Sequence, residues 1–192
     1  MKLVVILATL LCWVAVLASE NDKPDRGPTT IGQSAADALK SFASAQGALL
    51  PAGLIGKPIS KDDLSTILDY PKDEVVVLSL TGSQLKEAFE RSLLLFPEPN
   101  VGFLQVSGFE ITFDKNGQAN SKVTLVTVEG SKLEDTRKYD VAMPSSLQRG
   151  QLGYSHLWDK AKVVRTFPHS SMLDVLKGKH PSSSSPRWLP QG

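Results

Sequence analysis

Apolar residues recur at helical spacing in two parts of the chain. Between Gly32 and Ala45 they fall three and four residues apart, which is typical of a helix with one buried face. A second helix is predicted after Thr81, because Thr81 and Gln84 form a capping-box pattern. The residues behind that box that share one helical face are Leu85, Ala88, Phe89, Ser92 and Phe96.

The opposite face of this second helix is charged. Glu87 and Arg91 are four residues apart, as are Lys86 and Glu90. Such spacing allows weak ion pairs on an isolated helix, so these side chains are predicted to form a solvated surface.

The remaining regular pattern is that of strands. Residues 73–80 read DEVVVLSL, and the mostly β-branched run predicts a central strand covered on both faces. Asp114 to Gly117 contain the residues that a hairpin turn requires. Further strands are predicted over 103–106, 109–113, 123–128, 139–143 and 163–167. Two short helices are predicted over 60–68, where Ser60 is the expected N-cap, and over 171–176.

The two ends of the chain differ from the region between them. One lysine precedes an apolar run from Leu3 to Leu17, which predicts a secretory signal peptide over residues 1–18 and a secreted, extracellular product. An uncleaved anchor is the alternative, although the run is shorter than the roughly 20 residues of a membrane span. Charge, proline and glycine predict a flexible linker over 19–29, and low hydrophobic content predicts a disordered tail over 178–192. The folded domain is therefore expected over 30–177.

Composition excludes several kinds of site. The net charge is +1 and the arginines are dispersed, so nucleic acid is not expected as a partner. The single cysteine, Cys12, lies in the predicted signal, which leaves no disulfide and no thiolate in the mature chain. His156, His169 and His180 are scattered and no metal-ligand spacing appears, so neither a metal nor a cofactor is predicted.

Several blocks in the order of the chain resemble the C-terminal domain of secreted 5'-nucleotidases. The first is Thr30 to Ala38, and the next is Ile59 to Leu64. The strand and helix over 75–90 are similar to a family block in which Gly82, Leu85 and Glu90 are in place. Two more similar blocks are 103–108 and 139–154. The resemblance implies an α+β fold in which a mixed β-sheet is flanked by helices.

The resemblance also implies a nucleoside pocket, made in that family by two aromatic rings and several polar groups. In this sequence Pro51 to Ile55 replace the family's asparagine and arginine loop, and Ser146 replaces the second aromatic residue. Leu152 stands where the family has an aspartate. The residues that remain as candidates for the substrate-binding site are Tyr70, Arg149, Gly150, Gly153 and Tyr154.

Two hypotheses about function follow. In the first, the chain is a secreted, non-catalytic binding or interaction module with a degenerate nucleoside pocket. In the second, it is the substrate-binding half or a fragment of a 5'-nucleotidase-type hydrolase and acts in nucleotide catabolism beside a metallophosphatase domain. The family places its catalytic metals in that other domain, so no catalytic residue is predicted here. A structural relic, or a partner of another protein, is a third possibility.

Overall fold

The computed structural model describes residues 23–57, 59–60, 62–158, 161–182 and 185–192. The predicted signal peptide, over residues 1–18, lies outside these residues. None of the helices formed by the described residues has the length and apolarity that a bilayer crossing requires.

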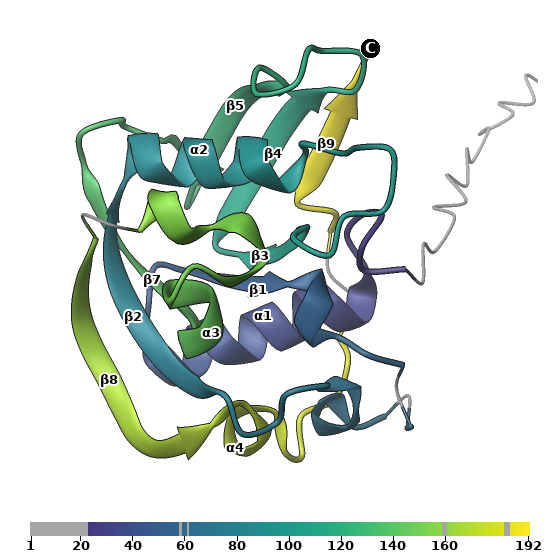
Figure 1. The fold of residues 1–192 in the computed structure, drawn as a ribbon, viewed down its shortest axis with the longest axis vertical. Helices are drawn as coiled ribbons and strands as arrows, with labels where there is room; N and C mark the ends of the chain where they lie inside the picture. Colours follow the sequence, from purple (N-terminus) through teal and green to yellow (C-terminus); the bar gives the residue numbers. More distant parts are fainter. Residues whose placement is uncertain (1–22, 58, 61, 159–160, 183–184) are drawn as a thin grey trace, which may run out of the picture.

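Two mixed β-sheets form the framework, with helices on their faces, as the α+β prediction expects (Figure 1). The larger sheet has the strand order β3-β1-β7-β2-β8, and the smaller has the order β6-β5-β4-β9. The strands are β1 (Gly47–Pro51), β2 (Glu74–Thr81), β3 (Leu104–Ser107), β4 (Phe109–Asp114), β5 (Val123–Val128), β6 (Ser131–Lys132), β7 (Lys138–Pro144), β8 (Lys162–Ser171) and β9 (Trp188–Gln191). In each sheet one parallel pair, β1 with β7 and β4 with β9, interrupts otherwise antiparallel pairing.

Three of the four α-helices below begin after an N-cap residue whose side chain accepts a backbone hydrogen bond: Thr29, Thr81 and Ser171. The four α-helices are α1 (Thr30–Ala43), α2 (Gly82–Ser92), α3 (Ser145–Gln148) and α4 (Met172–Leu176), with single 3₁₀ turns η1 (Ala52–Leu54), η2 (Leu64–Ile67), η3 (Gln151–Gly153) and η4 (Ser155–Leu157). The capping box predicted at Thr81 is confirmed, since Thr81 accepts from Gln84 N–H and Gln84 accepts from Thr81 N–H. The short helix predicted over 60–68 is only η2, and its cap is Asp63 rather than Ser60.

Strand β2 of the larger sheet is buried on both faces because its alternate residues enter different cores. Leu78 and Leu80 pack with α2 and the smaller sheet, whereas Val75 and Val77 pack with α1 and α4. Successive side chains of a strand point to opposite faces, so a strand between two cores must be apolar at nearly every position. The prediction of a central strand is therefore confirmed, with β7 and β8 as its neighbours.

The end of the chain forms a strand within the region, 178–192, where the sequence predicts a disordered tail. Residues 188–191 form β9, which pairs in parallel with β4. Trp188 is only 2% exposed, and its indole N–H donates to Leu104 O at 3.0 Å. The low average hydrophobicity of residues 178–192 conceals this anchor, because a single large aromatic side chain, Trp188, is buried between partly or fully exposed neighbours.

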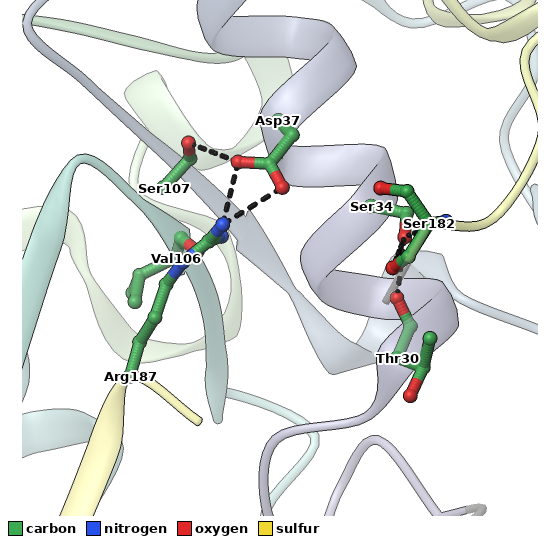
Figure 2. A network of polar contacts seen from close by, with 7 residues as sticks. All are labelled: Thr30, Ser34, Asp37, Val106, Ser107, Ser182 and Arg187. Carbon is green, nitrogen blue, oxygen red and sulfur yellow. Dashed lines mark hydrogen bonds and ion pairs between the residues drawn. The ribbon is translucent and has the colours of Figure 1, made fainter. Parts of the chain in front are cut away.

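Polar contacts also fasten this segment to α1 (Figure 2). The Arg187 guanidinium donates to both carboxylate oxygens of Asp37 at 2.7 Å, and it also contacts Val106 O. Ser182 N–H donates to the Ser34 hydroxyl at 3.0 Å. In Figure 2 these two contacts lie at different places along α1, so the segment is held at separate points.

The predicted linker is fastened as well, over the part that the structure describes. The wholly buried side chain of Gln105 donates to Pro24 O and Gly27 O and accepts from Thr29 N–H. Asn100 N–H donates to Asp25 O at 2.7 Å. Residues 23–29 therefore follow the surface of the larger sheet's edge instead of forming a free linker.

Candidate functional site

A cavity of about 500 Å³ lies between the turn before β2 and the segment that follows β7. Tyr70 stands in the turn, and its side chain is 61% exposed. Arg149 follows α3 on the other side of the cavity. The residues that line the cavity are Asp69, Tyr70, Pro71, Lys72, Asp73, Ser146, Arg149 and Gln151.

The turn that carries Tyr70 is fixed by backbone hydrogen bonds. Asp73 N–H donates to Tyr70 O at 3.1 Å. From the start of α4, Met172 N–H donates to Asp73 O at 2.7 Å and Leu173 N–H donates to Pro71 O at 2.9 Å. Because the two residues Pro71 and Asp73 are bonded to α4, the backbone that directly follows Tyr70 is fixed in place.

Asp73 joins the two walls of the cavity. Its carboxylate accepts from the Ser145 hydroxyl at 2.7 Å and from the Ser146 backbone N–H at 3.2 Å, and it also accepts from the Ser146 hydroxyl. These partners lie 72 and 73 residues away from Asp73 in the sequence. These contacts hold α3, and with it Arg149, against the Tyr70 turn.

The charges around the cavity balance. Lys72 and Arg149 are cationic, while Asp69 and Asp73 are anionic. Arg149 donates one N–H to the Ser145 hydroxyl at 2.9 Å, and Asp73 is engaged by the two serines. The cavity therefore has no excess of formal charge that would attract a strongly anionic ligand.

A glycine loop, residues 150–154, follows Arg149 directly. Gly150 and Gly153 have φ of 84° and 85°, and Leu152 between them has φ of 60°. A side chain at Gly150 would come within 2.3 Å of Ser155 Cα, so the loop needs glycine there both for its conformation and for its packing.

Tyr154 lies away from the cavity, in the core. It is completely buried, its hydroxyl donates to Gly102 O at 2.6 Å, and its ring stacks on Trp158 at a centroid distance of 5.7 Å. Of the five site residues that the sequence suggests, Tyr70 and Arg149 line the same cavity. Gly150 and Gly153 give the loop its positive-φ conformation, and Tyr154, at the end of the loop, is buried in the core. Burial raises the pKa of the Tyr154 phenol far above its usual value.

This buried phenol predicts an alkaline loss of stability. In the unfolded chain Tyr154 loses its proton near pH 10.0, whereas in the folded chain it keeps the proton to higher pH. Above pH 10.0 the unfolded state therefore binds fewer protons, and stability falls as pH rises, by at most about 1.4 kcal/mol per pH unit from this group. Urea unfolding of the wild-type chain and Tyr154→Phe, at neutral pH and near pH ~11, should show a smaller fall in the variant. Equal falls in the two proteins would contradict this prediction.

The lining residues that have no functional signal in the sequence include Lys72, Asp73 and Gln151. Lys72 and Asp73 lie two and three residues after Tyr70, so closeness in sequence to this candidate aromatic residue is the signal that could have identified them. Residues 51–55, which stand at the position of a polar loop in the resembled family, are not among the lining residues of this cavity.

A second cavity, of about 520 Å³, lies on the other side of the glycine loop, over the charged face of α2. Its lining includes Lys86, Glu87, Glu90, Arg91 and Gly153. Across the part of the chain that the structure describes, no group of three or more histidine, cysteine, aspartate or glutamate side chains is placed to hold a metal ion.

The solvated surface predicted for α2 is wrong for two of its residues. Glu90 is 8% exposed, and its two carboxylate oxygens accept from Lys122 N–H at 2.9 Å and Val123 N–H at 2.8 Å. Arg91 donates to Leu152 O and Gly153 O of the glycine loop. Residues 122–123 cover Glu90, and residues 152–153 contact Arg91. Spacing along a single helix does not reveal such contacts with distant segments.

A family model described as "5'-nucleotidase, C-terminal domain" matches residues 14–159. The chain is 28% identical over 145 residues to a 5'-nucleotidase-related protein of Glossina morsitans morsitans, a match that covers 68% of this chain and 26% of that protein. It is 32% identical over 110 residues to a 5'-nucleotidase of Mus musculus, a match that covers 53% of this chain and 19% of that protein.

Solved structures share the fold. A 5'-nucleotidase precursor from Thermus thermophilus superposes with a TM-score of 0.74 at 22% identity, over 86% of this chain and 36% of that chain. NAD nucleotidase from Haemophilus influenzae superposes with a TM-score of 0.67 at 14% identity, over 88% of this chain and 36% of that chain. The chain thus spans about a quarter of the Glossina relative and about a third of these two structures.

Proposed function

The chain belongs to the 5'-nucleotidase C-terminal domain family, and from this premise we propose that it is a secreted, non-catalytic binding module that holds a nucleoside in the Tyr70 cavity. One observation carries the proposal. Tyr70, Ser146, Arg149 and Gln151, from two separate segments, converge on one cavity of about 500 Å³. That volume lies within the range of small-molecule sites.

The chemistry of the cavity suits a ligand with one flat ring and neutral polar groups. The exposed ring of Tyr70 offers a stacking face for a base. Arg149 retains N–H donors beyond the one given to Ser145, and Gln151 adds an amide, so ribose hydroxyls find both donors and acceptors. Because the cavity's charges balance, an uncharged nucleoside is favoured over a nucleotide.

Two features support the other parts of the proposal. The apolar run from Leu3 to Leu17 supports secretion. The acidic group that joins the cavity walls, Asp73, accepts hydrogen bonds from Ser145 and Ser146, so its oxygens are occupied in holding α3 rather than free to act as a general base.

We expect Tyr70→Ala to weaken adenosine binding by about 5- to 150-fold, because base–aromatic stacking contributes roughly 1–3 kcal/mol. Tyr70→Phe keeps the ring and should bind adenosine nearly as well as the wild-type chain. Isothermal titration calorimetry with adenosine, and with AMP at the same concentrations, measures both effects and the preference for the uncharged ligand. Equal affinity in Tyr70→Ala and wild type, or no heat at millimolar adenosine, would refute the proposed site.

Partial coverage of the relatives favours a second candidate function. The matched proteins include 5'-nucleotidases that are several times longer than the matched region. The chain would then be the substrate-binding half of a hydrolase and would act with a metallophosphatase domain. Phosphate release from AMP separates the two candidates. The proposed module releases none with added divalent metal, whereas chelator-sensitive turnover by the chain, alone or mixed with a metallophosphatase domain, would favour the second.

A further inference from the structure

Arg91 reaches from α2 to the backbone of the glycine loop. Its Nη2 donates to Leu152 O at 3.0 Å and its Nε donates to Gly153 O at 3.3 Å. The guanidinium carbon also lies 5.7 Å from the ring centroid of Tyr154, the next residue. One side chain thus contacts three consecutive residues of a loop that is distant in the sequence.

The fit between Arg91 and the loop is close. A Cβ atom built on Gly153 would lie 2.4 Å from Arg91 Nη2, so any side chain there would displace the guanidinium. The carbonyls of Leu152 and Gly153 both accept from the charged guanidinium. Hydrogen bonds that involve a charged group are stronger than those between neutral groups. The third nitrogen, Nη1, is buried with no hydrogen-bond partner in the described part of the chain. The guanidinium is therefore held in this place by the loop and by Tyr154, at the cost of one unpaired donor.

The loop needs such a support. Gly150, Leu152 and Gly153 all have positive φ, and Leu152 is not a glycine, so its conformation is disfavoured unless its surroundings impose it. Gly150 N–H donates to Leu147 O at 2.9 Å, Tyr154 N–H donates to Gln151 O at 3.3 Å, and Tyr154 O accepts from Leu157 N–H at 3.1 Å. None of these three bonds involves the carbonyls of Leu152 and Gly153, which accept from Arg91.

The same loop forms a wall of the Tyr70 cavity. Arg149 and Gln151 line the cavity on one side, while Gly153 and Arg91 line the second cavity on the other. Since Arg91 bonds to the residues directly after Gln151, any movement of Leu152 and Gly153 shifts the backbone that carries Gln151 and Arg149.

We infer that Arg91 is a positioning residue for this cavity: it lies outside the cavity and sets the backbone of residues 150–154, and through it the placement of Arg149 and Gln151. For its effect on nucleoside affinity the inference rests on the proposed function. For its effect on the loop it rests only on the contacts of Arg91.

The test uses the full chain and two readouts. Arg91→Met keeps an unbranched side chain of similar length and removes both hydrogen bonds and the guanidinium over Tyr154. Glu87→Gln, one turn earlier on the same lined face of α2, is the matched control. Amide hydrogen exchange at Gly150 and Tyr154 reports opening of the loop. Calorimetry with adenosine reports affinity of the folded protein, well below its unfolding temperature.

We expect exchange at Gly150 and Tyr154 to rise about tenfold in Arg91→Met, with a fall of similar size in adenosine affinity, and no change in Glu87→Gln. Arg91→Lys keeps the charge but loses the two-pronged geometry, so it should fall between wild type and Arg91→Met, and it serves if the methionine variant does not fold. Unchanged exchange in the variants overturns the inference. Faster exchange with unchanged adenosine affinity also overturns it, because the loop would then be held for stability alone.

Failure of the proposed function gives a different result. If the wild-type chain binds no adenosine, the nucleoside site is refuted, while the exchange measurement still decides whether Arg91 sets the loop. If wild type binds adenosine and Arg91→Met binds it equally, the nucleoside site stands and the positioning role falls.

Discussion

We expect Trp188→Ala to lower the free energy of unfolding by about 3–5 kcal/mol, the usual cost of truncating a large buried aromatic side chain. Trp188 is 2% exposed and packs its indole against three phenylalanine rings. Those rings are Phe89 of α2, Phe103 and Phe113, at centroid distances of 5.8, 5.0 and 6.2 Å. The substitution would leave a void at the junction of α2 and the two sheets.

The loss should include a hydrogen bond as well as packing. Trp188 donates to Leu104 O at 3.0 Å in a buried setting, and the variant leaves that carbonyl with one partner fewer. Denaturation by urea, followed by fluorescence and by circular dichroism, measures the free energy of unfolding. Leu189→Ala is the control, since Leu189 is the next residue of β9 and 39% exposed. Similar losses in the two variants would show that the contacts of β9 as a whole matter, and not the buried indole.

We expect Glu90→Ala to lower the free energy of unfolding by about 2–4 kcal/mol. The Glu90 carboxylate accepts from Lys122 N–H and Val123 N–H, both in buried contacts, at the point where the β4–β5 connection enters β5. Removing it leaves two backbone donors without partners, and an unsatisfied buried donor costs roughly 1–3 kcal/mol. The same denaturation experiment measures this loss.

Two variants sharpen the test of Glu90. Glu90→Gln keeps the size and one acceptor oxygen, so it should lose less stability than Glu90→Ala. Glu87→Gln changes a charge on the exposed part of α2 and should stay within about 0.5 kcal/mol of wild type. If Glu90→Ala is as stable as Glu87→Gln, the hydrogen bonds of Glu90 contribute nothing to the free energy of unfolding.

The predicted tail and the predicted linker show that local composition does not reveal contacts with distant parts of the chain. Residues 178–192 are mostly polar, so their average predicts disorder, yet Trp188 and Arg187 each find a specific partner surface. The composition of residues 23–29 likewise predicts a flexible linker, yet Gln105, which is distant in the sequence, holds this segment by hydrogen bonds. A wholly buried glutamine can be recognised only when the backbone groups around it are known.

The candidate site was predictable in part. Tyr70 and Arg149 could be found from the resemblance, and the structure places both on one cavity. Tyr154 could not be separated from them, because a tyrosine beside a glycine loop suits a ligand face or a core equally well, and only its complete burial distinguishes the two. Asp73 and Arg91 carried no recognisable signal, since their partners are the serines before Arg149 and the carbonyls after Gln151.

By itself, the sequence determined the elements whose causes are local: the α1 stripe, the capping box at Thr81, and β2, whose unbroken apolar run requires cover on both faces. It also determined the family, through blocks that recur in order. Only the tertiary structure decided which polar side chains are structural and which face the cavity. Periodicity reports how a residue sits in its own helix or strand, whereas the partner of Glu90, Arg91 or Trp188 lies in another segment that the fold alone brings near.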